Sequence, residues 1–271
     1  MVREVAVEGW GLHSGQRARV VLSTGGAQGH PVVLRAGAVE APVAELVVTS
    51  TNRATTVEAH GGALRVGTVE HLFAALAGLH VHRDLVIDLD GPELPLLDGG
   101  AAQWADAVES LGIAPHPSPS RIVRPATIEA GASRYELSPG PTTLIEVCLE
   151  LDDARLLATA RWEGDAGDFR RRIATARTFA FARDVPELVR LELARHVEPT
   201  SVVVVTPEAI HWAGAPFRAD EPARHKVLDL MGDLYLHGGP PLGRVRAFRP
   251  GHTGNAHAFR EAREAGLFAA R

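Results

Sequence analysis

The chain has 271 residues and a mass of 28.9 kDa, with 45% apolar and 23% charged positions, and this composition excludes a disordered chain, a coiled coil and collagen. A formal net charge of -5 offers no basic surplus to a phosphate backbone, so we expect no nucleic acid partner. No stretch reaches the roughly 20 consecutive apolar residues of a membrane-spanning helix, which leaves only peripheral membrane contact open. Because Cys148 is the single cysteine and the N-terminus is polar and broken by glycine, we expect a cytoplasmic protein without disulfides.

Apolar patterns divide the chain into two halves of similar size. The segment at 112–120 holds three prolines and a glycine, which neither a helix nor a central strand accommodates, so we predict domains at 1–113 and 120–271. The first half has strand-like alternation at 17–22, 32–34, 55–57 and 85–90, and helical spacing at 68–79 and 101–111.

The second half repeats this organisation. Strands are predicted at 122–128, 133–137, 143–149, 201–205 and 243–248, and helices at 168–176, 224–236 and 256–265. Strands followed by helices in both halves predict an α+β fold with the helices on one face of each sheet. His71 and His225 lie in corresponding helices, so two copies of a related unit could bring these helices face to face.

The helix predicted at 224–236 carries a polar stripe through an otherwise apolar sequence. His225, Asp229 and Asp233 recur every four residues and therefore share one helix face. His225 and Asp229 are both competent zinc ligands. A solvated face with ordinary charges is the alternative, because a His-x3-Asp spacing often arises by chance.

The helix predicted at 68–79 supplies the groups that would complete a catalytic zinc site. It begins with Thr68 as a candidate N-cap and places Glu70 beside His71. A catalytic zinc takes three protein ligands and a water, and a neighbouring glutamate can accept the proton of that water. His71, His225 and Asp229 would be the ligands and Glu70 the base. Fe2+ is an alternative metal, since imidazole and carboxylate ligands also accept it, and a purely structural role for Glu70 and His71 is the alternative to a site.

Two further motifs suggest amide hydrolysis. His252 lies in a glycine-flanked turn between a predicted strand and a predicted helix, and as an imidazolium it could stabilise an oxyanion and protonate a leaving amine, with Asp233 orienting it. The Ala-Arg-Thr-Phe stretch at 176–179 closes a predicted helical segment. It offers Thr178 as an oxyanion donor and Phe179 as an aromatic wall. The alternatives are a hydrogen-bonded loop histidine and a core phenylalanine.

His13 lies in a glycine-rich segment at 9–15, which permits close backbone approach to a ligand but also suits a plain hairpin. We expect surface or structural roles for the histidines at 30, 60, 80, 82, 116, 196 and 211.

The motifs follow one another in a fixed order: Gly-Leu-His-Ser-Gly at 11–15, Thr-Val-Glu-His-Leu at 68–72, Ala-Leu-Ala-Gly-Leu at 75–79, Pro-Glu-Leu-Pro-Leu-Leu-Asp-Gly at 92–99, Ala-Arg-Thr-Phe at 176–179, Arg-His-Lys-Val-Leu-Asp at 224–229 and Gly-His at 251–252. In this combination, the chain resembles the zinc-dependent UDP-3-O-acyl-N-acetylglucosamine deacetylases, a family that acts early in lipid A biosynthesis. The resemblance covers nearly the whole chain. It implies two β-α-α-β sandwich domains with the active site between facing helix layers.

Position by position, the resemblance implies a role for each candidate. The zinc ligands fall on His71, His225 and Asp229. The general base falls on Glu70, and the second catalytic histidine falls on His252, with Asp233 as its orienting partner. The oxyanion-stabilising threonine falls on Thr178, and substrate contacts fall on Lys226, Phe179 and Asp184. We add His13 as a candidate substrate contact, since it lies in the first motif of the series. Lys226 is the only lysine beside 27 arginines, which we interpret as a position where a compact ammonium fits and a planar guanidinium does not.

One stretch departs from the family pattern. The family carries an insert in its second domain that forms a hydrophobic tunnel for the 3-O-acyl chain, usually with a Gly-Gly-Ser-containing stretch before a strand. Here the corresponding residues at 195–201 read Arg-His-Val-Glu-Pro-Thr-Ser. The spacing from Phe181 to His225 predicts that the insert is present, but Glu198 and Pro199 leave the length of the acyl chain open.

We therefore expect a monomeric zinc amidohydrolase that removes acetate from the 2-acetamido group of an acylated nucleotide sugar. One alternative is a related deacetylase that acts on a different N-acyl sugar or nucleotide sugar. A zinc-binding pseudoenzyme or nucleotide-sugar binding protein is the other. None of the catalytic residues that the resemblance implies is missing, which disfavours this last alternative.

Overall fold

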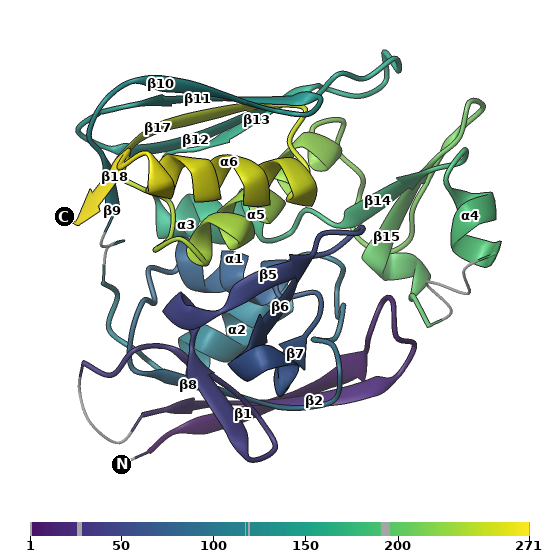
Figure 1. Cartoon of the computed structure of the whole chain (residues 1–271). Coiled ribbons are helices and arrows are strands. Elements are labelled where there is room, and N and C mark those ends of the chain that lie inside the picture. The colour runs from purple at the N-terminus through teal and green to yellow at the C-terminus, as the bar shows by residue number, and fades with distance from the viewer. Residues whose placement is uncertain (1, 26–28, 117, 119, 191–195, 271) are drawn as a thin grey trace.

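The computed structural model describes residues 2–25, 29–116, 118, 120–190 and 196–270. Two layered halves are stacked so that their helices meet in the middle and their large sheets lie on the outside (Figure 1). A smaller unit projects from one side, around the helix and strands labelled α4, β14 and β15. Pro117 and Pro119 of the predicted boundary, and Arg195 of the divergent stretch, lie outside the described residues. The domain limits stay a prediction.

The first half is built on a five-stranded sheet in the order β1-β2-β8-β3-β4. Its strands are β1 (Glu4–Trp10), β2 (Arg17–Thr24), β3 (Val33–Ala36), β4 (Val39–Pro42) and β8 (Leu85–Asp90). On β2 the apolar Ala18, Val20 and Leu22 are buried while Arg17 and Arg19 are exposed, as the alternation predicts. Strand β8 pairs antiparallel with β2 and parallel with β3.

Two helices and a small sheet complete this half. The helices are α1 (Glu70–Gly78) and α2 (Ala102–Ser110), and the small sheet consists of β5 (Val47–Ser50), β6 (Thr56–Ala59) and β7 (Leu64–Val66). The single turn η1 (Val43–Glu45) joins β4 to β5, and the single turn η2 (His60–Gly62) joins β6 to β7. Every residue of α1 is buried. This helix therefore lies between layers of protein on all sides, which explains its Ala- and Leu-rich sequence.

The second half repeats the sheet arrangement in the order β10-β11-β17-β12-β13. Its strands are β10 (Ala126–Ala130), β11 (Ser133–Ser138), β12 (Thr143–Cys148), β13 (Thr159–Trp162) and β17 (Gly243–Phe248). Strand β17 pairs antiparallel with β11 and parallel with β12, which matches the pairing of β8 in the first half. Helices α5 (Glu221–Tyr235) and α6 (His252–Glu264) cover its inner face (Figure 1).

The two helix layers meet where α1 packs against α5. A Cβ atom at Gly232 of α5 would overlap the backbone of Glu70 at the start of α1. A glycine at this position therefore permits the two backbones to approach closely. The start of α1 and the middle of α5 are therefore close together. The helices that carry His71 and His225 face each other, as the sequence predicts.

The remaining elements belong to the projecting unit and to the ends of the second half. The projecting sheet consists of β14 (Thr178–Phe181), β15 (Val202–Val205) and β16 (Ile210–His211), with α4 (Val185–Arg190) and the turn η4 (Pro199–Ser201) beside it. Its own small apolar cluster is centred on Leu156, Val203 and Val205. A short α3 (Ala166–Asp168) runs into the π-helix η3 (Phe169–Ile173), and β9 (Ser120–Ile122) pairs with β18 (Phe268–Ala270).

The α+β fold class is confirmed, and three local predictions are wrong. The strand predicted at 122–128 is interrupted between β9 and β10, where Pro125 has no N–H for a sheet ladder. Residues 178–181 do not end a helix but form β14, which pairs in parallel with β15. The helix predicted from 256 begins at His252, so this histidine is the first residue of α6 and not part of a turn.

Candidate metal centre and active site

Helices α1 and α5 bring three ligand-competent side chains together. His71, His225 and Asp229 each offer one atom, and these atoms all lie within 4.8 Å of one another. All three residues are buried, and the two imidazole rings meet edge to face with centroids 5.3 Å apart. Two imidazoles and a carboxylate in such a cluster are donors that a divalent metal ion accepts.

Hydrogen bonds to the backbone orient both imidazoles. Nδ1 of His71 lies 2.9 Å from the carbonyl oxygen of Gly100, and Nδ1 of His225 lies 3.0 Å from that of Ala176. Since a carbonyl oxygen only accepts, each ring donates its Nδ1–H and keeps a lone pair on Nε2 for a cation. Burial, with His225 close by, lowers the pKa of His71 to about 3, and burial also lowers the pKa of His225. Both rings are therefore neutral near pH 7, as a metal ligand must be.

Asp229 supplies the negative charge of the cluster. Burial opposes this charge, but Lys226 and His225 hold the pKa of Asp229 well below its usual range. Its Oδ2 accepts a hydrogen bond of 2.7 Å from Nζ of Lys226, whereas its buried Oδ1 has no hydrogen-bond partner among the described residues. A buried carboxylate oxygen without a donor fits a cation ligand, since it otherwise costs free energy to bury.

Glu70 lies next to this cluster at the first position of α1. Its Oε2 accepts a 3.0 Å hydrogen bond from the backbone N–H of Thr55, and its Oε1 lies 3.8 Å from Nε2 of His252. Burial raises the pKa of Glu70 to about 7, opposed by His252 and supported by Asp233. A carboxylate with a pKa near neutrality can both accept and release a proton at pH 7.

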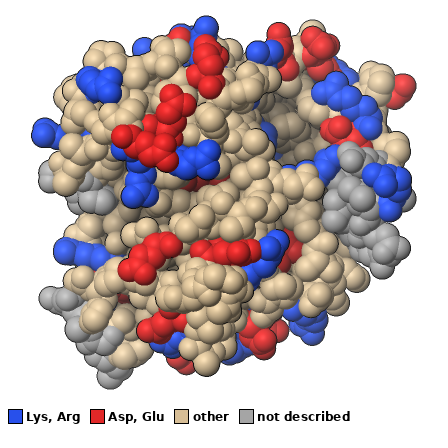
Figure 2. Space-filling model, viewed as in Figure 1, with Lys and Arg blue, Asp and Glu red and all other residues tan. Residues whose placement is uncertain are grey.

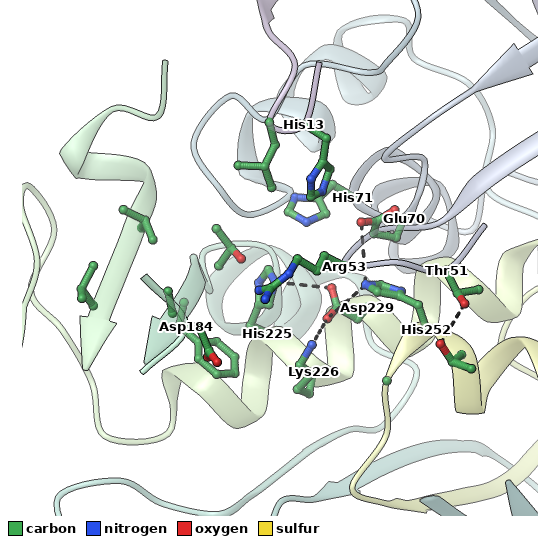
Figure 3. Close-up of a pocket in the computed structure, with 18 of the residues that line it drawn as sticks. His13, Thr51, Arg53, Glu70, His71, Asp184, His225, Lys226, Asp229 and His252 are labelled. Atoms are coloured by element: carbon green, nitrogen blue, oxygen red, sulfur yellow. Dashed lines mark hydrogen bonds and ion pairs between the residues drawn. The ribbon is translucent and has the colours of Figure 1, made fainter. Parts of the chain in front are cut away.

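His252 faces Glu70 from the start of α6. Its Nδ1 lies 2.9 Å from Oδ2 of Asp233, and its Nε2 lies 3.9 Å from Oδ2 of Asp229 (Figure 3). Burial opposes a charge on the ring, but the carboxylates of Asp233 and Glu70 raise the pKa of His252 to about 10. The imidazolium is therefore the form present at pH 7, and it can donate a proton from Nε2.

A hydrogen-bond network that the sequence does not predict surrounds the carboxylate of Asp233. Oγ1 of Thr55 donates to Oδ1 of Asp233 over 2.6 Å, and Nδ2 of Asn255 donates to its Oδ2 over 2.7 Å. Oη of Tyr135 in turn donates to Oδ1 of Asn255 over 2.6 Å. Every oxygen of the Asp233 carboxylate is thus occupied. Asn255 lies three residues after His252 on α6, and this helical spacing is a sequence signal that places both side chains on one face. No local sequence pattern indicates that Thr55 belongs to the site.

A cavity of about 980 Å³ opens onto these groups, and both polar and apolar side chains line it. Its polar lining includes Glu70, His71, His225, Lys226, Asp229, His252 and Arg249, and its apolar lining includes Leu12, Phe179, Val185, Val202, Val204 and Trp212. The face drawn in Figure 2 is hollowed between the two halves, and acidic and basic side chains alternate around it without one dominant sign.

The structure places the remaining sequence-predicted residues at this cavity. Thr178, Phe179, Asp184 and His13 all line it. Phe179 lies beside the cluster, since its ring centroid is 6.1 Å from that of His225 and 5.7 Å from Nζ of Lys226. Asp184 lies farther along the projecting unit, and His13 lines the same cavity as His71 (Figure 3). All the predicted site residues except Asp233 therefore line one cavity, and Asp233 is joined to this lining by its hydrogen bond with His252.

Comparison with known proteins identifies the family. The family model described as LpxC, UDP-3-O-acyl N-acetylglycosamine deacetylase, matches residues 1–263. The chain belongs to this family. It is 34% identical over 265 residues to the UDP-3-O-acyl-N-acetylglucosamine deacetylase of Myxococcus xanthus strain DK1622, a match that covers 94% of this chain and 83% of that protein. It is 33% identical over 268 residues to the protein of the same name from Brucella melitensis biotype 2, with 95% and 92% covered.

Family membership confirms the resemblance drawn from the ordered motifs. One local prediction at the site is wrong: Thr68 is not the N-cap of α1, because Val69 holds that position. Thr68 has a φ of 55° and donates its hydroxyl to Glu93 instead. None of the helices that the structure describes has the length and hydropathy to cross a membrane.

Proposed function

We propose that this protein hydrolyses the 2-acetamido group of UDP-3-O-acyl-N-acetylglucosamine to the free amine and acetate, a reaction of lipid A biosynthesis. One observation carries the proposal: three buried metal-ligand side chains lie within 4.8 Å of one another, beside Glu70 and His252, in a member of this deacetylase family. The names of the two relatives support the substrate.

His71, His225 and Asp229 would hold the metal, with Zn2+ as the proposed ion and Fe2+ as the alternative that the same donors accept. A bound dication of this kind polarises the amide carbonyl and acidifies a water molecule. Asp229 would bind the ion through its carboxylate, whose Oδ1 has no hydrogen-bond partner among the described residues while Oδ2 accepts from Lys226. The backbone carbonyls that accept from both imidazoles would hold the two rings in a fixed orientation.

The protein side chains then move the protons of the reaction. Glu70 accepts a proton from the water as the water oxygen forms a bond to the amide carbon. The imidazolium of His252 and the hydroxyl of Thr178 stabilise the negative oxygen that develops on this carbon. When the C–N bond breaks, His252 donates its Nε2 proton to the departing nitrogen, which leaves as the amine. Asp233 holds His252 in the required orientation throughout.

The polar and apolar lining of the cavity suits a substrate with a sugar and an acyl chain. We propose that the apolar side chains of the projecting unit, such as Val202 and Val204, contact the 3-O-acyl chain and that Lys226, Phe179, Asp184 and His13 contact the sugar and its neighbouring groups. Lys226 reaches Asp229 and lies over the ring of Phe179, so its ammonium lies close to the reacting centre. A compact ammonium fits this position, where a planar guanidinium would need more space.

A second candidate is a deacetylase of the same family that acts on a different N-acyl sugar or nucleotide sugar. The divergent stretch favours it, since its residue Pro199 lines the cavity and Trp212, another lining residue, is 49% exposed. A panel of UDP-N-acetylglucosamine derivatives with 3-O-acyl chains of graded length distinguishes the two. A sharp optimum in kcat/KM supports the first proposal, and indifference to the acyl group supports the second.

The direct test is to assay the purified protein on the acylated UDP-sugar with and without a chelator. We expect acetate and free amine in equal amounts, loss of both on chelation, and recovery on adding Zn2+. UDP-N-acetylglucosamine without the acyl chain is the control and should react far more slowly. Stoichiometric Zn2+ binding without acetate release from any substrate would contradict the proposal and support the pseudoenzyme alternative.

We also infer a monomer in the cytoplasm. The single chain supplies every group placed at the site, and Cys148 is the only cysteine of the sequence. Light scattering and cell fractionation test the two inferences.

A further inference from the structure

The Pro-Glu-Leu-Pro-Leu-Leu-Asp-Gly motif at 92–99 contains a buried acid that the mechanism does not use. Glu93 is only 3% exposed, and its carboxylate accepts hydrogen bonds from two separate parts of the first half. One part is the loop at 11–15, where the backbone N–H of Ser14 lies 2.7 Å from Oε2 and that of His13 lies 3.1 Å from each carboxylate oxygen. The other is the hydroxyl of Thr68, 2.5 Å from Oε1.

The loop at 11–15 is shaped around this carboxylate. Consecutive backbone N–H groups point at one anion, as in the anion-binding nests of turns. A Cβ atom at Gly11 would overlap the carboxylate of Glu93 and the hydroxyl of Ser14, so the close approach requires glycine. The loop closes on itself through hydrogen bonds from Gly11 N–H to Gln16 and from Gly15 N–H to Gly11. The carboxylate of Glu93 therefore joins this loop to the rest of the first half through the backbone N–H groups of His13 and Ser14.

The backbone of Glu93 is fixed to the residues just before α1. Gly67 donates its N–H to Pro92 over 3.1 Å, and Leu94 donates its N–H to Gly67 over 3.0 Å. Thr68, next in the chain, adopts the left-handed φ of 55° and directs its hydroxyl to the carboxylate. Glu70 and His71 follow directly. Through Glu93, the loop at 11–15 is thus held against the same backbone that positions the base and the first metal ligand.

His13 is the side chain that this arrangement presents to the cavity. Its Nε2 is buried and has no hydrogen-bond partner among the described residues, and the residue lines the same cavity as His71 (Figure 3). Burial lowers the pKa of His13, opposed by the charge of Glu93, so the ring is neutral and Nε2 is available to a substrate group. An imidazole on a glycine-rich loop needs an external anchor to keep such a position.

We propose that Glu93 is a positioning residue, which holds the loop at 11–15 in register with the start of α1 so that the imidazole of His13 reaches the bound substrate beside the metal ligands. The proposal rests on the proposed function in one respect, that His13 contacts the substrate. It does not make Glu93 a catalytic residue, because its carboxylate is enclosed by Ser14, His13 and Thr68 and does not line the large cavity.

Kinetics of four variants test the positioning role. Glu93→Ala should raise KM by about tenfold, the factor equivalent to about 1.4 kcal/mol, and leave kcat within about threefold. His13→Ala should raise KM to a similar extent, and the double variant should raise it no further, because a loop without its anchor has already lost the His13 contact. Glu93→Gln is the conservative control and should recover most of the loss, since its amide oxygen can accept from Ser14 and its NH2 can donate to Thr68.

Hydrogen exchange gives a readout that does not depend on activity. In the metal-free protein, Glu93→Ala should speed exchange in the peptide at 11–16 while the peptide at 70–78 in α1 keeps its protection, and Glu93→Gln should stay close to the native pattern.

If Glu93→Ala is too unstable to purify, a comparison of Thr68→Val with Thr68→Ser tests the same contact with Glu93. Unchanged exchange at 11–16, or KM effects of Glu93→Ala and His13→Ala that multiply, would overturn the proposal. An inactive native protein would refute the proposed function, and the exchange result would still decide the anchoring role.

Discussion

Thr55 and Asp233, 178 positions apart in the sequence, are joined by a hydrogen bond of 2.6 Å from Oγ1 to Oδ1. The backbone N–H of the same threonine donates to Glu70, and its carbonyl accepts the N–H of Val69 at the start of α1. Thr55 thus contacts the proposed base from the first half and, from the second half, the carboxylate that accepts from His252. One buried residue therefore links the two groups that we propose to transfer protons.

We therefore expect Thr55→Val to lower kcat by about tenfold or more, because it keeps the shape but leaves a buried carboxylate oxygen of Asp233 without its donor, at a cost of about 1–3 kcal/mol. Thr55→Ser keeps the hydroxyl and should remain within about threefold of the native kcat. Metal content, KM and melting temperature are measured on both variants. Equal kcat values for the valine and serine variants would show that the hydroxyl has no role in the reaction.

Glu70→Gln removes the ability of this side chain to accept a proton but keeps the shape of the site. The amide keeps an oxygen that can accept from the N–H of Thr55, but it cannot take a proton from water. Removing a general base typically costs a factor of about 10² to 10⁴, so we expect turnover to fall by at least about two orders of magnitude. Elemental analysis should show that the metal is retained, as Glu70 is outside the cluster of three ligands. Near-normal turnover would exclude Glu70 as the base.

The sequence predicts the groups whose relationship is local. His225, Asp229 and Asp233 follow from a four-residue helical spacing, and the pairing of Glu70 with His71 follows from adjacency at a helix start. The facing of the two helices also follows from the internal repeat. These features require no knowledge of how distant segments pack.

The remaining groups are set by packing between distant segments. Glu93 reaches a loop 80 residues earlier, and Thr55 reaches across both halves, so neither has a signature in a window of sequence. Thr68 shows the same limit at a single position. The Ser/Thr preference at helix starts predicts a cap, but the left-handed backbone that the approach of Glu93 requires directs its hydroxyl elsewhere.

The pH dependence of kcat/KM should be bell-shaped. Glu70 must be ionised to accept a proton, so its raised pKa of about 7 predicts activity that increases as the pH rises through this value. His252 must be protonated to donate, so its raised pKa of about 10 predicts activity that is lost as the pH rises through that value. A bound dication lowers both pKa values, and we expect both limbs at or below these positions.

His252→Ala tests the assignment of the basic limb. The variant should lose this limb and about 10² to 10⁴ in rate, while the acidic limb from Glu70 remains. Asp233→Asn is the companion variant, because it removes the charge that favours the imidazolium and should move the basic limb to lower pH. A basic limb that is unchanged in both variants would assign it to another group, such as the metal-bound water.

Gly232→Ala tests whether the contact between the two helix layers sets the site geometry. Inside a helix, alanine is favoured over glycine by about 1 kcal/mol, which alone would stabilise the protein. The new methyl group, however, would overlap the backbone of Glu70, and overpacking against a buried backbone costs about 1–3 kcal/mol because that backbone cannot turn away as a side chain can. We expect the second effect to prevail, so the melting temperature should fall by a few degrees and Zn2+ should bind more weakly, since α1 and α5 carry the proposed ligands between them.

Gly140→Ala is the control for Gly232→Ala, as its Cβ would meet nothing closer than 3.5 Å. A Gly232→Ala protein that is more stable and binds Zn2+ with native affinity would show that the helix layers have room to adjust, and that the ligand spacing does not depend on this contact.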